Sequence, residues 1–151
     1  MNIEQAYYRL QKISAKDQAQ LLSQLNEKQV LILSSQLLNA VKILLEEGVN
    51  HLSTITGVYQ GETLIMLYHF WLGEGLTLRV IIDENNNEVD TLTQFIPGAL
   101  FYEREIAEMF GITINGIDTS NKMFLPDNWQ NGAPMRKEKA EIAEDNSLED
   151  K

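Results

Sequence analysis

The densest group of side chains that could do chemistry is Glu103-Arg104-Glu105, followed by Glu108. Two carboxylates can act as general acid and general base when their surroundings separate their pKa values. Helical spacing argues against such a pair here, because residues 103, 104 and 105 would point in directions about 100° apart. Arg104 and Glu108 stand four positions apart and can pair, and the acidic residues suit the first turns of a helix. The cluster is therefore typical of a charged helix, with an acid–base pair as the alternative.

The two histidines, His51 and His69, form no metal-binding or nucleophile motif. They do not make HExxH or another helical pair, and the glycines form neither a phosphate-binding loop nor a GxGxxG turn. No GxSxG elbow occurs, and no local motif points to a Ser–His–Asp triad. Because His69 lies in the most apolar predicted strand, we interpret it as a hydrogen-bonded core residue.

Composition narrows the class of protein further. The 151 residues are 44% apolar and 23% charged, which fits one ordinary globular domain. A formal net charge of −10 with only 12 basic residues makes nucleic acid a poor partner, because its binding depends on Lys and Arg. Without cysteine the chain has no disulfides, thiolate nucleophiles or Cys-ligated zinc or iron–sulfur sites.

No apolar run reaches the length of a membrane span. The first residues, Met-Asn-Ile-Glu-Gln, lack the pattern of a signal peptide. We therefore expect a soluble chain that reaches a membrane only through its partners.

Hydrophobic periodicity predicts an α+β fold, with N-terminal helices packed on a small, mostly antiparallel sheet. A loose capping pattern at Ser14–Asp17 and the spacing of Leu21, Leu22 and Leu25 predict one helix. Leucines and valine over residues 37–45 predict another, ended by Gly48. Val30–Leu33 is either a strand or a turn of buried helix. Short turns join three further runs into an antiparallel meander, namely Leu52–Tyr59, Thr63–Leu72 and Leu76–Ile82.

The second half of the chain predicts a helix and then irregular structure. A short helix is expected over Asp90–Phe95, broken by Pro97-Gly98, and a longer one over Phe101–Phe110, stopped by Gly111. We divide the chain into an α+β domain (1–111), an extended partner-binding segment (112–138) and an acidic tail (139–151). The tail has too few large apolar groups to offset its ordering entropy, so we expect it to be disordered.

The extended segment carries large apolar residues that its irregular sequence does not explain, namely Met123, Phe124, Leu125, Trp129 and Met135. Two interpretations stay open. These residues either fasten the segment onto its own domain or form a contact surface for another subunit, because aromatic and Met residues are favoured in interface cores.

One block of sequence, with two further pieces in register, resembles a known family. Residues 97–112 read PGALFYEREIAEMFGI, residues 124–129 read FLPDNW and residues 132–137 read GAPMRK. Together they resemble the 30 kDa subunit family of complex I, the NADH:quinone oxidoreductase, which includes a related subunit of membrane-bound, energy-converting NiFe hydrogenases. HLSTITGV and the later LYHF also fit, so the resemblance covers roughly residues 36–137. Glu108 and Tyr59 stand where the family has Asp, and the usual His-Pro after Gly111 is missing.

The resemblance implies a non-catalytic structural and assembly subunit that binds no cofactor and no metal. It implies docking on a NiFe-hydrogenase-like large subunit (the 49 kDa type), near an iron–sulfur small subunit, at the cytoplasmic face of the cell membrane. The short length inclines this expectation towards the hydrogenase branch over the NADH–quinone branch. The implied interface residues are Glu103, Arg104, Glu105, Glu108, Phe110, Gly111, Phe124, Asp127, Trp129 and Arg136.

Two hypotheses from other classes remain. The chain could be a small hydrolase or isomerase that uses Glu103 or Glu105 with His69, which requires these groups to converge in an enclosed pocket. It could also be a binding module that self-associates through its aromatic strand.

Overall fold

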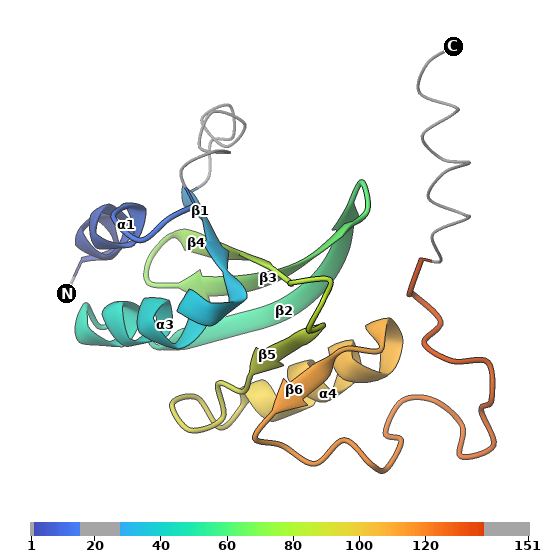
Figure 1. Cartoon of the computed structure of the whole chain (residues 1–151). Coiled ribbons are helices and arrows are strands. Elements are labelled where there is room, and N and C mark those ends of the chain that lie inside the picture. Colours follow the sequence, from blue (N-terminus) through green and yellow to red (C-terminus); the bar gives the residue numbers. More distant parts are fainter. Residues whose placement is uncertain (1, 16–27, 138–151) are drawn as a thin grey trace.

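The computed structural model describes residues 2–15 and 28–137 of the chain (Figure 1). The predicted face of Leu21, Leu22 and Leu25, and the tail 139–151, lie outside these residues. In chain order the elements are α1 (Ile3–Gln11), β1 (Lys28–Leu33), η2 (Ser34–Gln36), α3 (Leu37–Glu46), β2 (His51–Gln60), β3 (Thr63–Trp71), β4 (Gly75–Ile81), β5 (Glu88–Asp90), α4 (Ala99–Phe110) and β6 (Thr113–Asn115).

The main sheet has four strands in the order β1-β4-β3-β2. Strands β2, β3 and β4 pair antiparallel, which confirms the predicted meander. The run Val30–Leu33 belongs to a strand, β1, which lies parallel to β4 at the edge of the sheet. Pairing at this edge settles the choice between strand and helix, because it gives the backbone of a short apolar run its hydrogen bonds.

The helices and one face of the sheet enclose a single core. Buried residues of α1, α3 and α4 form one cluster with alternate residues of the strands, among them Met66, Tyr68 and Phe70 of β3. The alternation follows from the strand period of two residues. Helix α3 ends as predicted, since Gly48 follows it with φ 80.

The predicted helix over Asp90–Phe95 is wrong. Asp90 ends β5, which pairs in parallel with β6, and Val89 of β5 is buried opposite Ile114. After it, Leu92 accepts the N–H groups of residues 95 and 96 in a turn. Burial of Val89 in a long-range pairing outweighs local helical spacing, and the following Pro97 disfavours a helix there.

Helix α4 approaches the sheet where β2 has no side chain. An ideal Cβ on Gly57 would lie only 2.5 Å from the ring of Phe110, and the Tyr59 and Phe110 ring centroids are 6.1 Å apart. The absence of a Cβ at residue 57 therefore lets the last turn of α4 pack directly on β2.

We predict that Gly57→Ala destabilises the protein by about 2 kcal/mol, because the new methyl group overpacks against the Phe110 ring. The measurement is the free energy of unfolding from urea titration. Gly75→Ala is the matched control, since its Cβ would meet only the Trp71 side chain, at 4.0 Å. Equal stability changes in the two variants would contradict this account.

Candidate partner-binding site on α4 and the C-terminal segment

Helix α4 carries most of the residues implied by the family resemblance, and the core fixes its orientation. Its end is well defined, because Gly111 adopts the left-handed conformation with φ 65 and donates its N–H to the carbonyl of Ala107. A Cβ on Gly111 would also come within 3.1 Å of Ala133. The buried residues of the helix are Ala99, Glu103, Ile106, Ala107 and Phe110.

Glu103 carries an ionisable carboxyl group, yet none of its surface is exposed. Its two carboxylate oxygens accept the backbone N–H of Leu92 and the hydroxyl of Thr91, each at 2.6 Å. Burial raises the pKa of Glu103, and the two hydrogen bonds only partly oppose this shift. Burial, and then the nearby Glu103 carboxylate, raise the pKa of Tyr68. Glu103 therefore holds α4 against the segment that follows β5 and acts inside the chain.

The outer face of α4 binds the backbone of the C-terminal segment, residues 116–137, which we call the strap. The Glu108 carboxylate accepts three consecutive backbone N–H groups, those of residues 123–125, at 2.8 and 3.1 Å for the last two. Arg104 donates to the carbonyl of Asn121 at 2.7 Å. The two side chains stand at a spacing that allows pairing, but they form no ion pair with each other, because strap backbone groups engage both.

These contacts also shift the protonation of Glu108. Its partial burial acts to raise the pKa, but the three N–H donors and the positive charge of Arg104 outweigh it. The pKa of Glu108 is therefore lowered, and the carboxylate is ionised at neutral pH.

The far end of the strap closes over the C-terminus of α4. Arg136 donates to the carbonyl of Phe110 at 3.1 Å and to the side chain of Asn87 at 2.9 Å. Asn87 in turn donates to the carbonyl of Gly111 at 2.8 Å. A guanidinium at this position satisfies carbonyls that the helix leaves unpaired and complements its dipole.

The strap leaves large apolar side chains in solvent. Met123, Phe124 and Met135 are 37%, 45% and 54% exposed, and Phe101 at the start of α4 is 58% exposed. Trp129 is half-buried and closes the strap on itself, since its indole N–H donates to the carbonyl of Gly132 at 2.7 Å. The exposed side chains of Met123, Phe124 and Met135 thus fit a contact surface for another subunit. Trp129 instead fits the interpretation in which the apolar residues hold the segment in place.

The remaining implied residues lie on the same two elements. Glu105 is half-exposed on α4 and Asp127 is exposed on the strap. Sequence reasoning missed Thr91 and Asn87, which supply contacts to α4 from distant segments. One feature of the sequence could have singled out Asn87, namely its place in the polar loop after β4. Asn tolerates a positive φ in such a loop, and Asn87 has φ 50.

The side chains required for a hydrolase do not converge. Tyr68 belongs to the core cluster, so the next residue on β3, His69, points to the opposite face of the sheet. There its Nδ1 lies 2.9 Å from the Thr77 hydroxyl. Both oxygens of Glu103 are already occupied by donors of its own chain.

The fold and this surface define a class of small α+β domain in which one helix, α4, holds an extended C-terminal strap. Over residues 30–144 the chain matches the family described as the 30 Kd subunit of respiratory-chain NADH dehydrogenase. The match spans more than half of the sequence, and the chain belongs to this family. Within the described part of the chain, no helix has the length and apolarity to cross a membrane.

Individual relatives agree with this assignment. The chain is 36% identical over 95 residues to the C subunit of NADH-quinone oxidoreductase from Roseiflexus sp. strain RS-1, which covers 59% of this chain and 54% of that protein. It is 40% identical over 76 residues to the C/D subunit of the same enzyme from Erwinia tasmaniensis, covering 48% of this chain and 12% of that protein. The chain thus spans about half of the first relative and a small part of the second.

Two solved structures share the fold. A chain of the membrane-bound sulfane sulfur reductase, an archaeal respiratory membrane complex, superposes with a TM-score of 0.65 at 17% identity, covering 85% of this chain and 88% of that chain. The trypsin-resistant fragment (1–134) of Nqo5 gives 0.55 at 23% identity, covering 61% and 81%.

Glu103→Gln should fold, because the Thr91 hydroxyl can reorient to accept from the new amide. Glu103→Ala should lower the free energy of unfolding by about 3 kcal/mol, because it leaves the Leu92 N–H unsatisfied.

The raised pKa of Glu103 favours the protonated form in the folded state. Its contribution to stability is therefore largest at low pH and falls as pH rises from the unfolded to the raised folded pKa. Urea titrations from about pH 4 to about pH 8 should show the stability of the wild type falling relative to Glu103→Gln. A pH-independent difference would contradict this role.

Glu108→Gln should loosen the strap, since an amide oxygen carries no charge and replaces only part of the carboxylate that the N–H groups of residues 123–125 share. The lowered pKa of Glu108 means that its contribution is present above the unfolded pKa and is lost as pH falls through the folded value. Hydrogen exchange of these three amides at neutral pH is the measurement. Glu105→Gln, the same change on the same helix, should leave their protection unchanged. Equal effects of the two variants would contradict the role of Glu108 in holding the strap.

Proposed function

We propose that this chain is a non-catalytic structural and assembly subunit of a complex-I-like respiratory complex, either an NADH:quinone oxidoreductase or an energy-converting membrane-bound hydrogenase. Membership of the 30 kDa subunit family supports the class of complex. The relative named as the C subunit of an NADH-quinone oxidoreductase supports the first branch. The chain of an archaeal respiratory membrane complex that shares the fold is compatible with the second.

The proposed docking partner is the NiFe-hydrogenase-like large subunit of the 49 kDa type, which corresponds to the D subunit of the NADH–quinone enzymes. Relatives named as C/D subunits support this choice, because the name assigns both subunits to one chain. A protein in this position would also lie near the iron–sulfur small subunit. It would reach the cytoplasmic face of the membrane only through the complex.

The observation that carries the proposal is how the strap is held. Glu108 and Arg104 bind strap backbone rather than strap side chains, and Arg136 fastens the other end to the last carbonyls of α4. The side chain of Phe124 is therefore presented outwards on a backbone fixed by polar bonds. A large aromatic side chain that is exposed and held in place has the character of an interface anchor, since little ordering entropy remains to be lost on binding.

In this proposal Arg104, Glu108 and Arg136 position the strap, while Phe124 and neighbouring Asp127 contact the partner. Glu103, Phe110 and Gly111 set the position and the end of the helix from within the chain. Trp129 maintains the turn of the strap. The family resemblance gives no catalytic or cofactor-binding role to any of them.

We predict that Phe124→Ala lowers the yield of assembled complex by about tenfold without changing the stability of the isolated chain, because a half-exposed anchor contributes to binding and little to folding. Arg104→Ala should weaken assembly in the same direction through the loss of its bond to Asn121. Native gels of gently solubilised membranes measure both. Trp71→Ala is the matched control, since this aromatic residue is 52% exposed at the end of β3.

Normal assembly of both variants would refute the role assigned to this surface. A tagged pull-down followed by mass spectrometry tests the class of complex itself. Recovery of the large and iron–sulfur subunits is the expected result, and accompanying NADH-oxidising or hydrogenase modules would identify the branch. Recovery of the chain alone, with light scattering that shows a dimer, would favour the self-associating binding module instead.

A further inference from the structure

A row of aliphatic side chains crosses the face of the main sheet that points away from the helices. The strand register aligns Leu33 of β1 with Ile81 of β4, Ile81 with Ile65 of β3, and Ile65 with Val58 of β2. Side chains alternate along a strand, and the core cluster contains the neighbours Ile32, Val80, Leu64 and Met66. The four residues of this aliphatic row therefore face the other way, and the core cluster contains none of them.

The aliphatic row is partly open to solvent. Ile65 at its centre is only 2% exposed, but Val58 and Leu33 at its ends are 38% and 51% exposed. Single exposed aliphatic residues are ordinary, but here the two exposed ends belong to one row, aliphatic across all four strands, that a partner would bury together. At a strand spacing of about 4.8 Å the row is roughly 14 Å long, which about ten residues of an α-helix would span.

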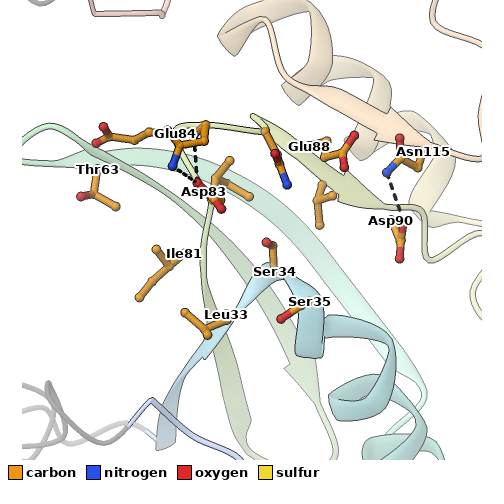
Figure 2. Close-up of a pocket in the computed structure, with 14 residues that line it drawn as sticks. Leu33, Ser34, Ser35, Thr63, Ile81, Asp83, Glu84, Glu88, Asp90 and Asn115 are labelled. Carbon is orange, nitrogen blue, oxygen red and sulfur yellow. Dashed lines mark hydrogen bonds between the residues drawn. The ribbon is translucent and has the colours of Figure 1, made fainter.

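One end of the row runs into an acidic pocket of about 560 Å³ (Figure 2). Leu33 and Ile81 lie together at the strand ends, and acidic residues line the other side of the pocket. These carboxylates belong to Asp83 and Glu84 in the loop after β4 and to Glu88 and Asp90 of β5.

The carboxylates of the acidic pocket have no cationic partner within the described part of the chain. Asp83 accepts hydrogen bonds from Asn85, and Asp90 accepts one from Asn115 at 3.2 Å. The ion pairs of the described residues lie elsewhere, on Arg9 and Lys28. An aliphatic floor beside unpaired carboxylates matches the two halves of a Lys or Arg side chain, whose stem packs on apolar surface while its head seeks anions.

We propose that the aliphatic row and the acidic pocket form a second docking surface, separate from α4 and the strap, for an amphipathic helix of a partner protein. That helix would lay aliphatic side chains along the row and place Lys or Arg in the pocket. The charge disfavours other occupants. Carboxylates repel phosphate-bearing nucleic acids and anionic lipids, and a symmetric contact with a second copy would bring two acidic pockets towards each other.

The test uses the full chain, labelled for NMR, and two synthetic helical peptides of about fourteen residues with identical Leu positions. One peptide carries Lys between the leucines and the other carries Glu. The Lys peptide should shift the amide signals of the aliphatic row and of Glu88, and the Glu peptide should not bind. Shifts centred elsewhere, or equal binding of both peptides, would overturn the proposal.

Two matched pairs of variants locate the contact. Glu88→Lys should weaken binding of the Lys peptide roughly fourfold and make that binding less dependent on salt concentration. Glu62→Lys, the same charge change in the exposed turn after β2, should do neither. Val58→Ser should weaken it about fivefold, whereas Thr56→Ser on the same strand and face should not. Equal effects within either pair would mean non-specific charge attraction and would refute the site.

Sedimentation of the chain without peptide tests whether a second copy of the chain occupies the aliphatic row. A monomer is the expected result. Self-association that Val58→Ser abolishes would assign the row to a second copy and overturn the proposal. These experiments do not involve the large subunit, so their outcome is independent of docking through α4.

Discussion

A carboxylate sealed inside a protein must find its hydrogen-bond donors there, and this constraint fixes α4. Glu103 takes the Leu92 N–H and the Thr91 hydroxyl, which ties the first half of the helix to the segment after β5. Two turns later the Phe110 ring rests on Gly57 of β2. With both ends held, the rotation of the helix about its axis is set, and its outer residues project in fixed directions.

The outer face of α4 then organises a segment that has little core of its own. Glu108 accepts hydrogen bonds from three successive backbone N–H groups, and Arg136 donates to the carbonyls at the helix end. Charge-assisted bonds to backbone groups depend little on which side chains the strap carries. Large apolar residues such as Phe124 can therefore point outwards without disrupting the strap.

The two faces of the molecule differ in electrostatic character. On α4 and the strap, the charged side chains of Arg104 and Glu108 are engaged in internal bonds, and large apolar side chains such as Phe124 are exposed. Across the sheet, the carboxylates of the acidic pocket have no basic partner among the described residues. Polar groups that hold backbone define shape, whereas unpaired carboxylates select a partner by charge.

The sequence alone determined the elements whose signals are local. Helical spacing and Gly48 defined α3, β-branched runs between glycine turns defined the meander, and Gly111 ended α4. It also picked out the charged block at 103–108 through family resemblance. Only the tertiary structure decided that Glu103 turns inwards while Glu108 grips the strap, and that Arg136 meets Asn87 across 49 positions. Periodicity reports which face a residue occupies, but its partner depends on how distant segments close around it, and no local pattern encodes that.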